Sequence, residues 1–299
     1  MLDNLYVIER KILYNELRPL FDSLVSVRYA VIKGEVLSQQ IYGVPDKRRS
    51  SDIDILIEKS NVGMLEKQLK TLGFFQQLPQ NESEIRRNRV ICLAYSHQIP
   101  SYHKNLCGFQ LNVDINHDIF WGEYEGEKCY IDDFLNDTEN INIYGVSLKS
   151  LSIEKTFVQV VLHHYKEMNS IYILSQRNSI CTRMFRDLYD FLKIKSDTLT
   201  VNKVKNLSIQ YNIGSYIYYL LYYTNMIFKD EFLNNYLSAL ECYHNNDLLN
   251  SVGLNSLERR RWNNQFLERL DATDISKSLL ELLDNNDKKK IMLNHEIFT

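Results

Sequence analysis

The run from Ser51 to Ile57, with the sequence Ser-Asp-Ile-Asp-Ile-Leu-Ile, restricts the fold of this chain more than any other segment. Two carboxylates alternate with apolar residues, and this period of two is typical of a strand with one polar face. Successive side chains of a strand point to opposite faces, so we expect Asp52 and Asp54 to leave the same face while the isoleucines enter the core. Like charges this close repel each other, and carboxylate oxygens are the ligands that hard divalent cations prefer.

The residues before this run predict a strand, a glycine turn and a helix. Residues 28–33 alternate as a short strand that leads directly into Gly34, and residues 35–42 have helical spacing. Residues 43–51 form a polar loop that contains a glycine and a proline as breakers. A glycine at such a turn permits close approach of the backbone to a ligand, and Lys33 beside it is a candidate phosphate contact.

A third carboxylate is the natural complement of the pair. Asp114 lies in the middle of an alternating segment, 109–118, whose apolar residues face the other way. An acid at that place is costly unless it is paired or bound to a metal. We therefore expect Asp114 to join Asp52 and Asp54, with Asp118 as the alternative.

The remaining pattern divides the chain in two. Helical spacing predicts helices over residues 5–26 and 61–72, and a short apolar run predicts a strand over 90–95. From Leu151 onward the spacing is helical almost throughout, and we interpret the tyrosine-rich segment 216–228 as a buried helix.

Residues 132–149 show little periodicity, and we expect them to connect two domains. We predict an α/β (α+β) fold. A mixed sheet flanked by helices occupies residues 1–145 and carries the catalytic groups, and an all-helical domain occupies residues 146–299.

Composition excludes several classes of protein. An apolar content of 44% and a charged content of 24% are typical of globular chains. The net charge of −3 gives no general attraction to nucleic acid or to an anionic membrane. No apolar run reaches the length of a membrane span, and the five cysteines form no C-x-x-C pair, which argues against a zinc cluster or a disulfide framework. We expect a cytoplasmic protein.

Taken together, these residues resemble the DNA-polymerase-β-like nucleotidyltransferase superfamily, in which a strand ends in glycine, a short helix follows, and a D-x-D strand and a later acid complete the site. The chain is more similar to one bacterial branch of that superfamily, several members of which lie in gene clusters for modified peptides. The similarity spans roughly residues 5–230 and is carried by Ile32-Lys33-Gly34, Tyr42, Arg48, Ser51–Leu56, Val113–Asn116, Leu162–Lys166 and Leu188–Leu192.

The resemblance implies a Mg²⁺-dependent enzyme, with Mn²⁺ as a substitute, that moves a nucleoside monophosphate from an NTP to a small molecule, a peptide or a protein. Asp52, Asp54 and Asp114 would be the catalytic residues and metal ligands of a two-metal mechanism. The residues implied in nucleotide binding are Lys33, Gly34, Glu35, Arg48, Ser51, His163 and Lys166.

The chain departs from the pattern of these families at three positions. Glu35 stands where the superfamily has a small residue next to the glycine, and its charge would oppose a triphosphate unless the side chain turns away or binds metal. Asn116 replaces the histidine of the late strand, and Glu167 replaces a second histidine of the helical part.

Three alternatives stay open on the sequence. Glu35 favours a catalytically degenerate module that senses a nucleotide or binds a partner. A toxin-type nucleotidyltransferase that acts on tRNA or protein is the second, although the net charge argues against a nucleic-acid substrate. A glycosyltransferase that binds a sugar nucleotide through D-x-D is the third, and the early position of the motif disfavours it.

Overall fold

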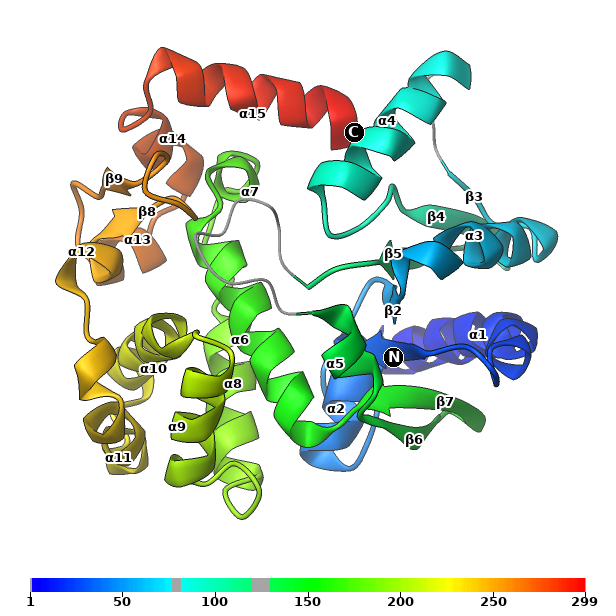
Figure 1. Cartoon of the computed structure of the whole chain (residues 1–299), viewed down its shortest axis with the longest axis horizontal. Coiled ribbons are helices and arrows are strands. Elements are labelled where there is room, and N and C mark those ends of the chain that lie inside the picture. The colour runs from blue at the N-terminus through cyan, green and yellow to red at the C-terminus, as the bar shows by residue number, and fades with distance from the viewer. Residues whose placement is uncertain (1, 77–81, 120–129, 299) are drawn as a thin grey trace. The chain divides into compact units, whose positions relative to one another are not determined.

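The computed structural model describes residues 2–76, 82–119 and 130–298 (Figure 1). Two compact units make up this part of the chain. The first contains the described residues up to 156, and the second contains residues 157–298.

A mixed sheet forms the centre of the first unit, which confirms the predicted fold class. In the described part of the chain its seven strands have the order β3-β4-β5-β2-β1-β7-β6. The bounds are β1 Tyr29–Ile32, β2 Ile53–Ile57, β3 Phe75–Gln76, β4 Tyr102–Leu106, β5 Phe109–Asn116, β6 Thr138–Ile143 and β7 Val146–Leu151.

Strand β5 alternates between buried and half-buried residues as the sequence predicts, whereas every residue of β2 is buried. Strand β2 pairs antiparallel with β1 and parallel with β5. The side chains of Ile55, Val113 and Ile115 are fully buried. Burial of this apolar row fixes the register, because a slip of one residue would turn every side chain to the other face.

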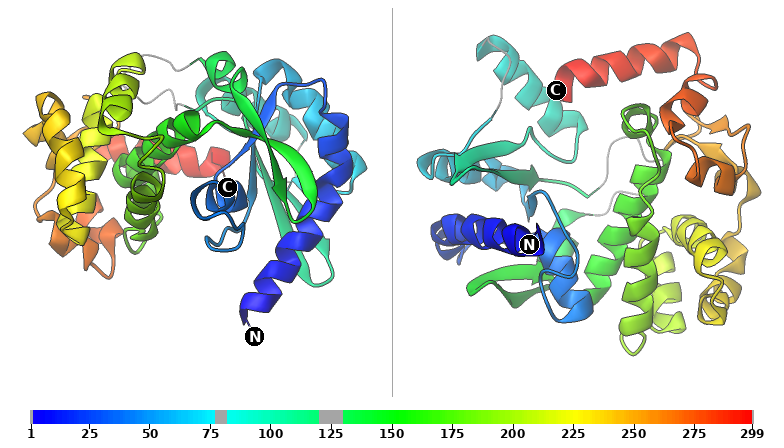
Figure 2. Two further views of the ribbon diagram at one scale, coloured as in Figure 1. Left: turned by 90° about the horizontal axis from the view of Figure 1, so that it is seen from below. Right: turned by 180° about the vertical axis from the view of Figure 1, so that it is seen from behind.

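Helices surround this sheet. Helix α1 packs against β5 and β7, and α2 packs against β1 and β6. Figure 2 shows α1 lying along the sheet. The helical elements of this unit are α1 Leu2–Ser23, α2 Gly34–Tyr42, the 3-10 turn η1 Lys59–Asn61, α3 Val62–Thr71, α4 Glu82–Tyr95 and α5 Ile131–Leu135.

The strand predicted over residues 90–95 is wrong, because these residues form the last turns of α4. Asn88 and Cys92 are buried while Val90 and Tyr95 are exposed. Burial at positions i and i+4 is the helical pattern. The short apolar run could not distinguish it from a strand.

The predicted connection over residues 132–149 contains α5 and most of a hairpin. Strands β6 and β7 pair antiparallel, and β7 joins the sheet beside β1. The turn residues Tyr144 and Gly145 both have positive φ, which matches the twist of a tight hairpin. Residues 146–156 therefore belong to the first compact unit. The alternation was missed because β6 lies at the sheet edge and exposes many polar side chains.

The second unit is helical, apart from a short strand pair. Helix α6 (Ile153–Asn169) begins in the first unit and continues into the second. The other elements are α7 Ile171–Ser175, α8 Arg183–Ile194, α9 Val201–Gln210, α10 Gly214–Phe228, α11 Glu231–Ala239, the 3-10 turn η2 Glu241–Tyr243, α12 Asn246–Leu249, β8 Ser251–Val252, β9 Arg260–Arg261, α13 Phe266–Leu270, α14 Ile275–Leu280 and α15 Asn285–Phe298.

The tyrosine-rich helix predicted over residues 216–228 is confirmed as α10. Tyr165 of α6 stacks on Tyr216 at 4.1 Å between ring centroids and meets Tyr219 edge-on at 5.2 Å. These aromatic contacts form part of the core of the second unit. Among the described helices, none is both long enough and apolar enough to cross a membrane.

Candidate active site

Three neighbouring strands bring the predicted acids together. The register places Asp54 of β2 beside Ile32 of β1 on one side and beside Asp114 of β5 on the other. Asp52 lies one residue before β2, and its side chain is half-buried, whereas that of Asp54 is buried. We call Asp52, Asp54 and Asp114 the carboxylate cluster.

Lys33 supplies a positive charge to this cluster. Its Nζ lies 2.6 Å from Asp54 Oδ1, and Asn116 Nδ2 donates to the same oxygen at 3.1 Å. The backbone of Lys33 has φ 59° and ψ −153°, which is a strained conformation for a residue other than glycine. Such strain is typical of functional positions, and here it occurs where the lysine follows β1 and meets Asp54.

Burial first, and the neighbouring carboxylates second, shift the pKa values of the cluster. Burial, followed by the charges of Asp54 and Asp52, raises the pKa of Asp114 to about 7, although a hydrogen bond from Ser101 opposes the shift. Burial and the charge of Asp54 also raise the pKa of Asp52. Burial alone would lower the pKa of Lys33, but the three carboxylates outweigh it and the pKa is raised.

Both the donor atoms and the charge of the cluster fit a hard divalent cation. In residues 2–76, 82–119 and 130–298, however, no three Asp, Glu, His or Cys side chains are arranged to hold a metal ion. Within the cluster, Lys33 and Asn116 bind one oxygen of Asp54, and Ser50 Oγ donates to Asp52 Oδ1 at 2.9 Å. Metal binding there would require Lys33 to release Asp54.

Gly34 allows the chain to turn beside the loop that leads to Asp52. Its φ is +45°, and a Cβ at this position would lie 3.2 Å from Ser50 Oγ and 3.3 Å from Ser50 Cβ. Helix α2 begins at this glycine, and the first N–H groups of a helix have no intrahelical partner. We predicted close approach to a phosphate here, and the observed close approach is to Ser50.

Glu35 is bound inside the first unit. Arg10 donates to its two carboxylate oxygens at 2.6 and 2.9 Å, and the hydroxyls of Tyr6 and Tyr14 donate at 2.6 and 3.3 Å. The side chain is 1% exposed. The carboxylate is therefore bound by side chains of α1. If Glu35 binds the nucleotide, as predicted, it does so through its backbone N–H.

The other two predicted residues of this unit lie in the loop between α2 and β2. Arg48 is half-buried, and its backbone N–H donates to Ser38 Oγ at 3.0 Å. Ser51 is exposed, and its carbonyl oxygen accepts from Asn112 Nδ2 at 3.2 Å. These bonds tie the loop to α2 and β5.

His163 and Lys166 lie on α6 in the second unit. The ring of His163 is half-buried, and its centroid is 5.6 Å from that of His164. Lys166 is buried, with its ammonium 4.0 Å from the carboxylate of Glu167. Their contact with a nucleotide stays a prediction.

Sequence reasoning missed Tyr6, Arg10, Ser50 and Ser101, all of which contact the carboxylate cluster or its supporting residues. A signal existed for two of them. Tyr6 and Arg10 lie on the stripe of α1 that continues through Leu13 and Leu17, so a charged residue stands on a buried helix face. A buried arginine requires a carboxylate partner, and Glu35 is the one that it has.

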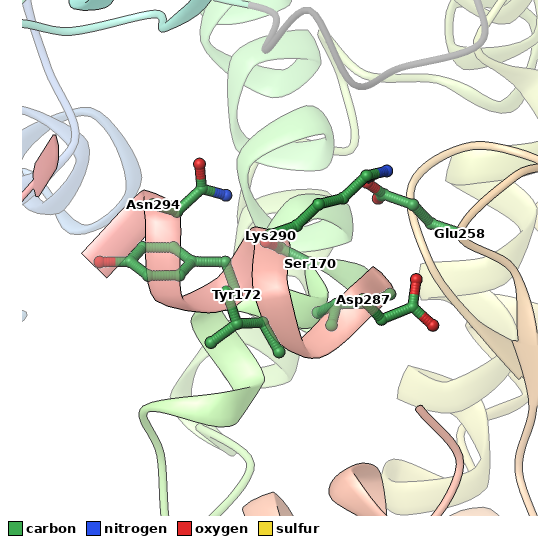
Figure 3. Close-up of a pocket in the computed structure, with 8 residues that line it drawn as sticks. Ser170, Tyr172, Glu258, Asp287, Lys290 and Asn294 are labelled. Carbon is green, nitrogen blue, oxygen red and sulfur yellow. Dashed lines mark hydrogen bonds and ion pairs between the residues drawn. The ribbon is translucent and has the colours of Figure 1, made fainter. Parts of the chain in front are cut away.

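The second unit has a small hollow that is open to solvent (Figure 3). Side chains of α7, α15 and the segment before β9 line it. Its charged groups are paired, with Lys290 3.3 Å from Glu258 and Asp287 2.7 Å from Arg260. This hollow offers no charge that would select a nucleotide.

Comparison with known proteins gives one family. The model of a family described as uncharacterised nucleotidyltransferase matches residues 7–229. No curated protein matches. The crystal structure of an antigenic nucleotidyltransferase-like protein from Paracoccidioides brasiliensis is similar at 15% identity, over 68% of this chain and 91% of that chain, with a TM-score of 0.35. At that score the structural likeness supports no argument about this chain.

Asp114→Asn will stabilise the metal-free protein at high pH. A carboxyl group whose pKa is raised on folding costs stability as the pH rises from about 4 to about 7. In EDTA at pH 8 we expect a Tm about 2 °C above wild type, which corresponds to roughly 1 kcal/mol for a chain of this length. The gain should shrink at pH 4.5, and Asp197→Asn, at an exposed position of the second unit, serves as the control. An equal gain at both pH values would contradict the pKa shift.

Gly34→Ala will destabilise the protein more than Gly43→Ala. Both glycines have positive φ, but a Cβ at Gly43 meets nothing within 4 Å, whereas one at Gly34 meets Ser50. The control should lose about 1 kcal/mol from the left-handed backbone alone. We expect a larger loss at Gly34, measured by urea unfolding. Equal losses would show that the contact with Ser50 is unimportant.

Proposed function

Because the chain belongs to the family of uncharacterised nucleotidyltransferases, we propose that it transfers a nucleoside monophosphate from an NTP to an acceptor in a Mg²⁺-dependent reaction. The observation that carries this proposal is the carboxylate cluster at the centre of the sheet, where Asp54 lies directly beside Asp114. The acceptor would be a small molecule, a peptide or a protein.

Asp52 and Asp54 would hold the two cations, and Asp114 would complete the second site. Mg²⁺, or Mn²⁺ in its place, would neutralise the triphosphate and make the acceptor hydroxyl more acidic. Asp114 would lie beside this hydroxyl and help to remove its proton. The hydroxyl oxygen would then attack the α-phosphorus of the NTP, and pyrophosphate would leave as the bond between the α- and β-phosphates breaks. The chain would thus use three side chains from two adjacent strands for both metal binding and proton transfer.

Lys33 would change partner when the substrate binds. Its ammonium and a metal ion compete for Asp54 Oδ1, because both are attracted to the same carboxylate oxygen. Once displaced, the ammonium would neutralise a phosphate oxygen of the NTP. Its strained backbone would keep the lysine at the start of α2, close to both positions.

The remaining nucleotide contacts of the first unit would come from the start of α2 and from the loop before β2. The free N–H groups at the start of α2, including those of Gly34 and Glu35, would bind phosphate oxygens. Arg48 and Ser51 would contact the triphosphate from the loop before β2.

The alternatives are now less favoured. Glu35 had motivated a degenerate, nucleotide-sensing module, but its charge is neutralised by Arg10. The family match favours nucleotidyl transfer over the D-x-D glycosyltransferase. A toxin-type enzyme that modifies tRNA or protein would use the same site and differs from our proposal in its acceptor.

Asp52→Asn and Asp54→Asn will abolish transfer. With α-³²P-labelled NTPs, Mg²⁺ and panels of small-molecule, peptide, protein and tRNA acceptors, we expect labelled product with wild type and at least a ~100-fold loss in either variant, as for removal of a key electrostatic group. Asp132→Asn, which changes an exposed carboxylate of α5, should transfer label normally. Undiminished transfer by folded Asp52→Asn and Asp54→Asn proteins would refute the assignment of these residues as catalytic metal ligands.

Lys33→Met will separate metal binding from triphosphate binding. Removal of the competing ammonium should tighten Mn²⁺ binding in the absence of nucleotide, whereas the affinity for Mn²⁺–NTP should fall about tenfold through loss of one charged contact. Affinity for the nucleoside monophosphate should change less. Calorimetry measures all three, and a variant that binds Mn²⁺ more weakly than wild type would contradict the exchange.

A further inference from the structure

Arg10 connects three elements of the first unit. Its side chain is fully buried on α1 and forms a bidentate ion pair with Glu35 of α2. Its Nη2 also donates to the backbone carbonyl of Asp52 at 2.7 Å. The guanidinium therefore holds the residue that enters β2 and carries the first carboxylate of the cluster.

Tyr6 holds the same loop two residues earlier. Its hydroxyl accepts from the backbone N–H of Ser50 at 2.9 Å and donates to Glu35 at 2.6 Å. Burial and the charge of Glu35 raise the pKa of Tyr6, so the hydroxyl keeps its proton. Tyr6 and Arg10 are four residues apart and lie on one face of α1.

These two contacts determine where the Asp52 carboxylate lies. They fix the N–H of Ser50 and the carbonyl of Asp52, and Ser50 Oγ in turn donates to Asp52 Oδ1 at 2.9 Å. The carboxylate is thus held through its own backbone and through the neighbouring serine.

We infer that Arg10, with Glu35 as its counter-ion and Tyr6 as its partner, is a positioning residue that sets the Asp52 carboxylate for metal and nucleotide. This inference rests on the proposed function. A buried ion pair is a costly way to join two helices, because apolar residues of similar size often do so with equal stability. An apolar pair, however, could not form the hydrogen bonds that hold residues 50–52.

The double variant Arg10→Met/Glu35→Leu tests this inference. It removes both charges together, so we expect a Tm close to wild type. Groups that orient metal ligands typically contribute 10–100-fold to metal affinity. We therefore expect calorimetry with Mn²⁺ and a non-hydrolysable NTP to show at least a tenfold loss of affinity. A well-folded double variant that binds as tightly as wild type would overturn the inference and leave the proposed function intact.

Tyr6→Phe and Tyr14→Phe form a matched pair that remains informative if the double variant does not fold. Both tyrosines lie on α1 and donate to Glu35, but the hydroxyl of Tyr6 also binds the loop at Ser50. Tyr6→Phe should weaken Mn²⁺–NTP binding severalfold, and Tyr14→Phe should leave it unchanged. Equal affinities in the two variants would count against the inference. Absence of metal-dependent NTP binding by wild type would instead refute the proposed function, and the inference with it.

Discussion

The pairing of β2 with β1 on one side and β5 on the other is the constraint on which the rest of the structure depends. It places Asp54 directly beside Asp114, and it ends β1 so that Lys33 reaches Asp54. The apolar side chains on the opposite face hold this register, because a shift of one residue would exchange the faces of the isoleucines and the carboxylates. The packing that stabilises the sheet therefore also assembles the charges.

Buried carboxylates need positive charges close to them, and two ion pairs of the first unit supply these charges. Lys33 pairs with Asp54 within the cluster, where a substrate cation would compete with it. Arg10 pairs with Glu35 in full burial, where no ligand competes. The Lys33–Asp54 pair is thus suited to exchange its partners when substrate binds, and the Arg10–Glu35 pair is suited to hold the loop before β2 in place. The strained backbone of Lys33 is consistent with a functional role of this residue, since strain persists only where the surrounding structure enforces it.

The spacing of apolar residues in the sequence predicts helices, strands and their buried faces well, but it cannot predict which side chains contact each other. It gave the D-x-D strand, the third acid and the helix after Gly34, because each is a local pattern. It failed at α4, where a run of six apolar residues fits both a helix and a strand, and at β6, where an edge strand exposes most of its side chains. It also missed Arg10, whose partner lies 25 residues away, since only the folded chain brings them together.

Glu35 shows why the position of a charge in the sequence does not locate that charge in the structure. It is the second residue of α2, where an anion would offset the partial positive charge of the helix N-terminus, about half an elementary charge. Its side chain is long enough to reach α1, where Arg10 neutralises it. The N-terminus of α2 therefore keeps its attraction for an anion. From the sequence, Glu35 is expected to oppose a phosphate. In the structure it instead binds Arg10, which donates to the backbone carbonyl of Asp52.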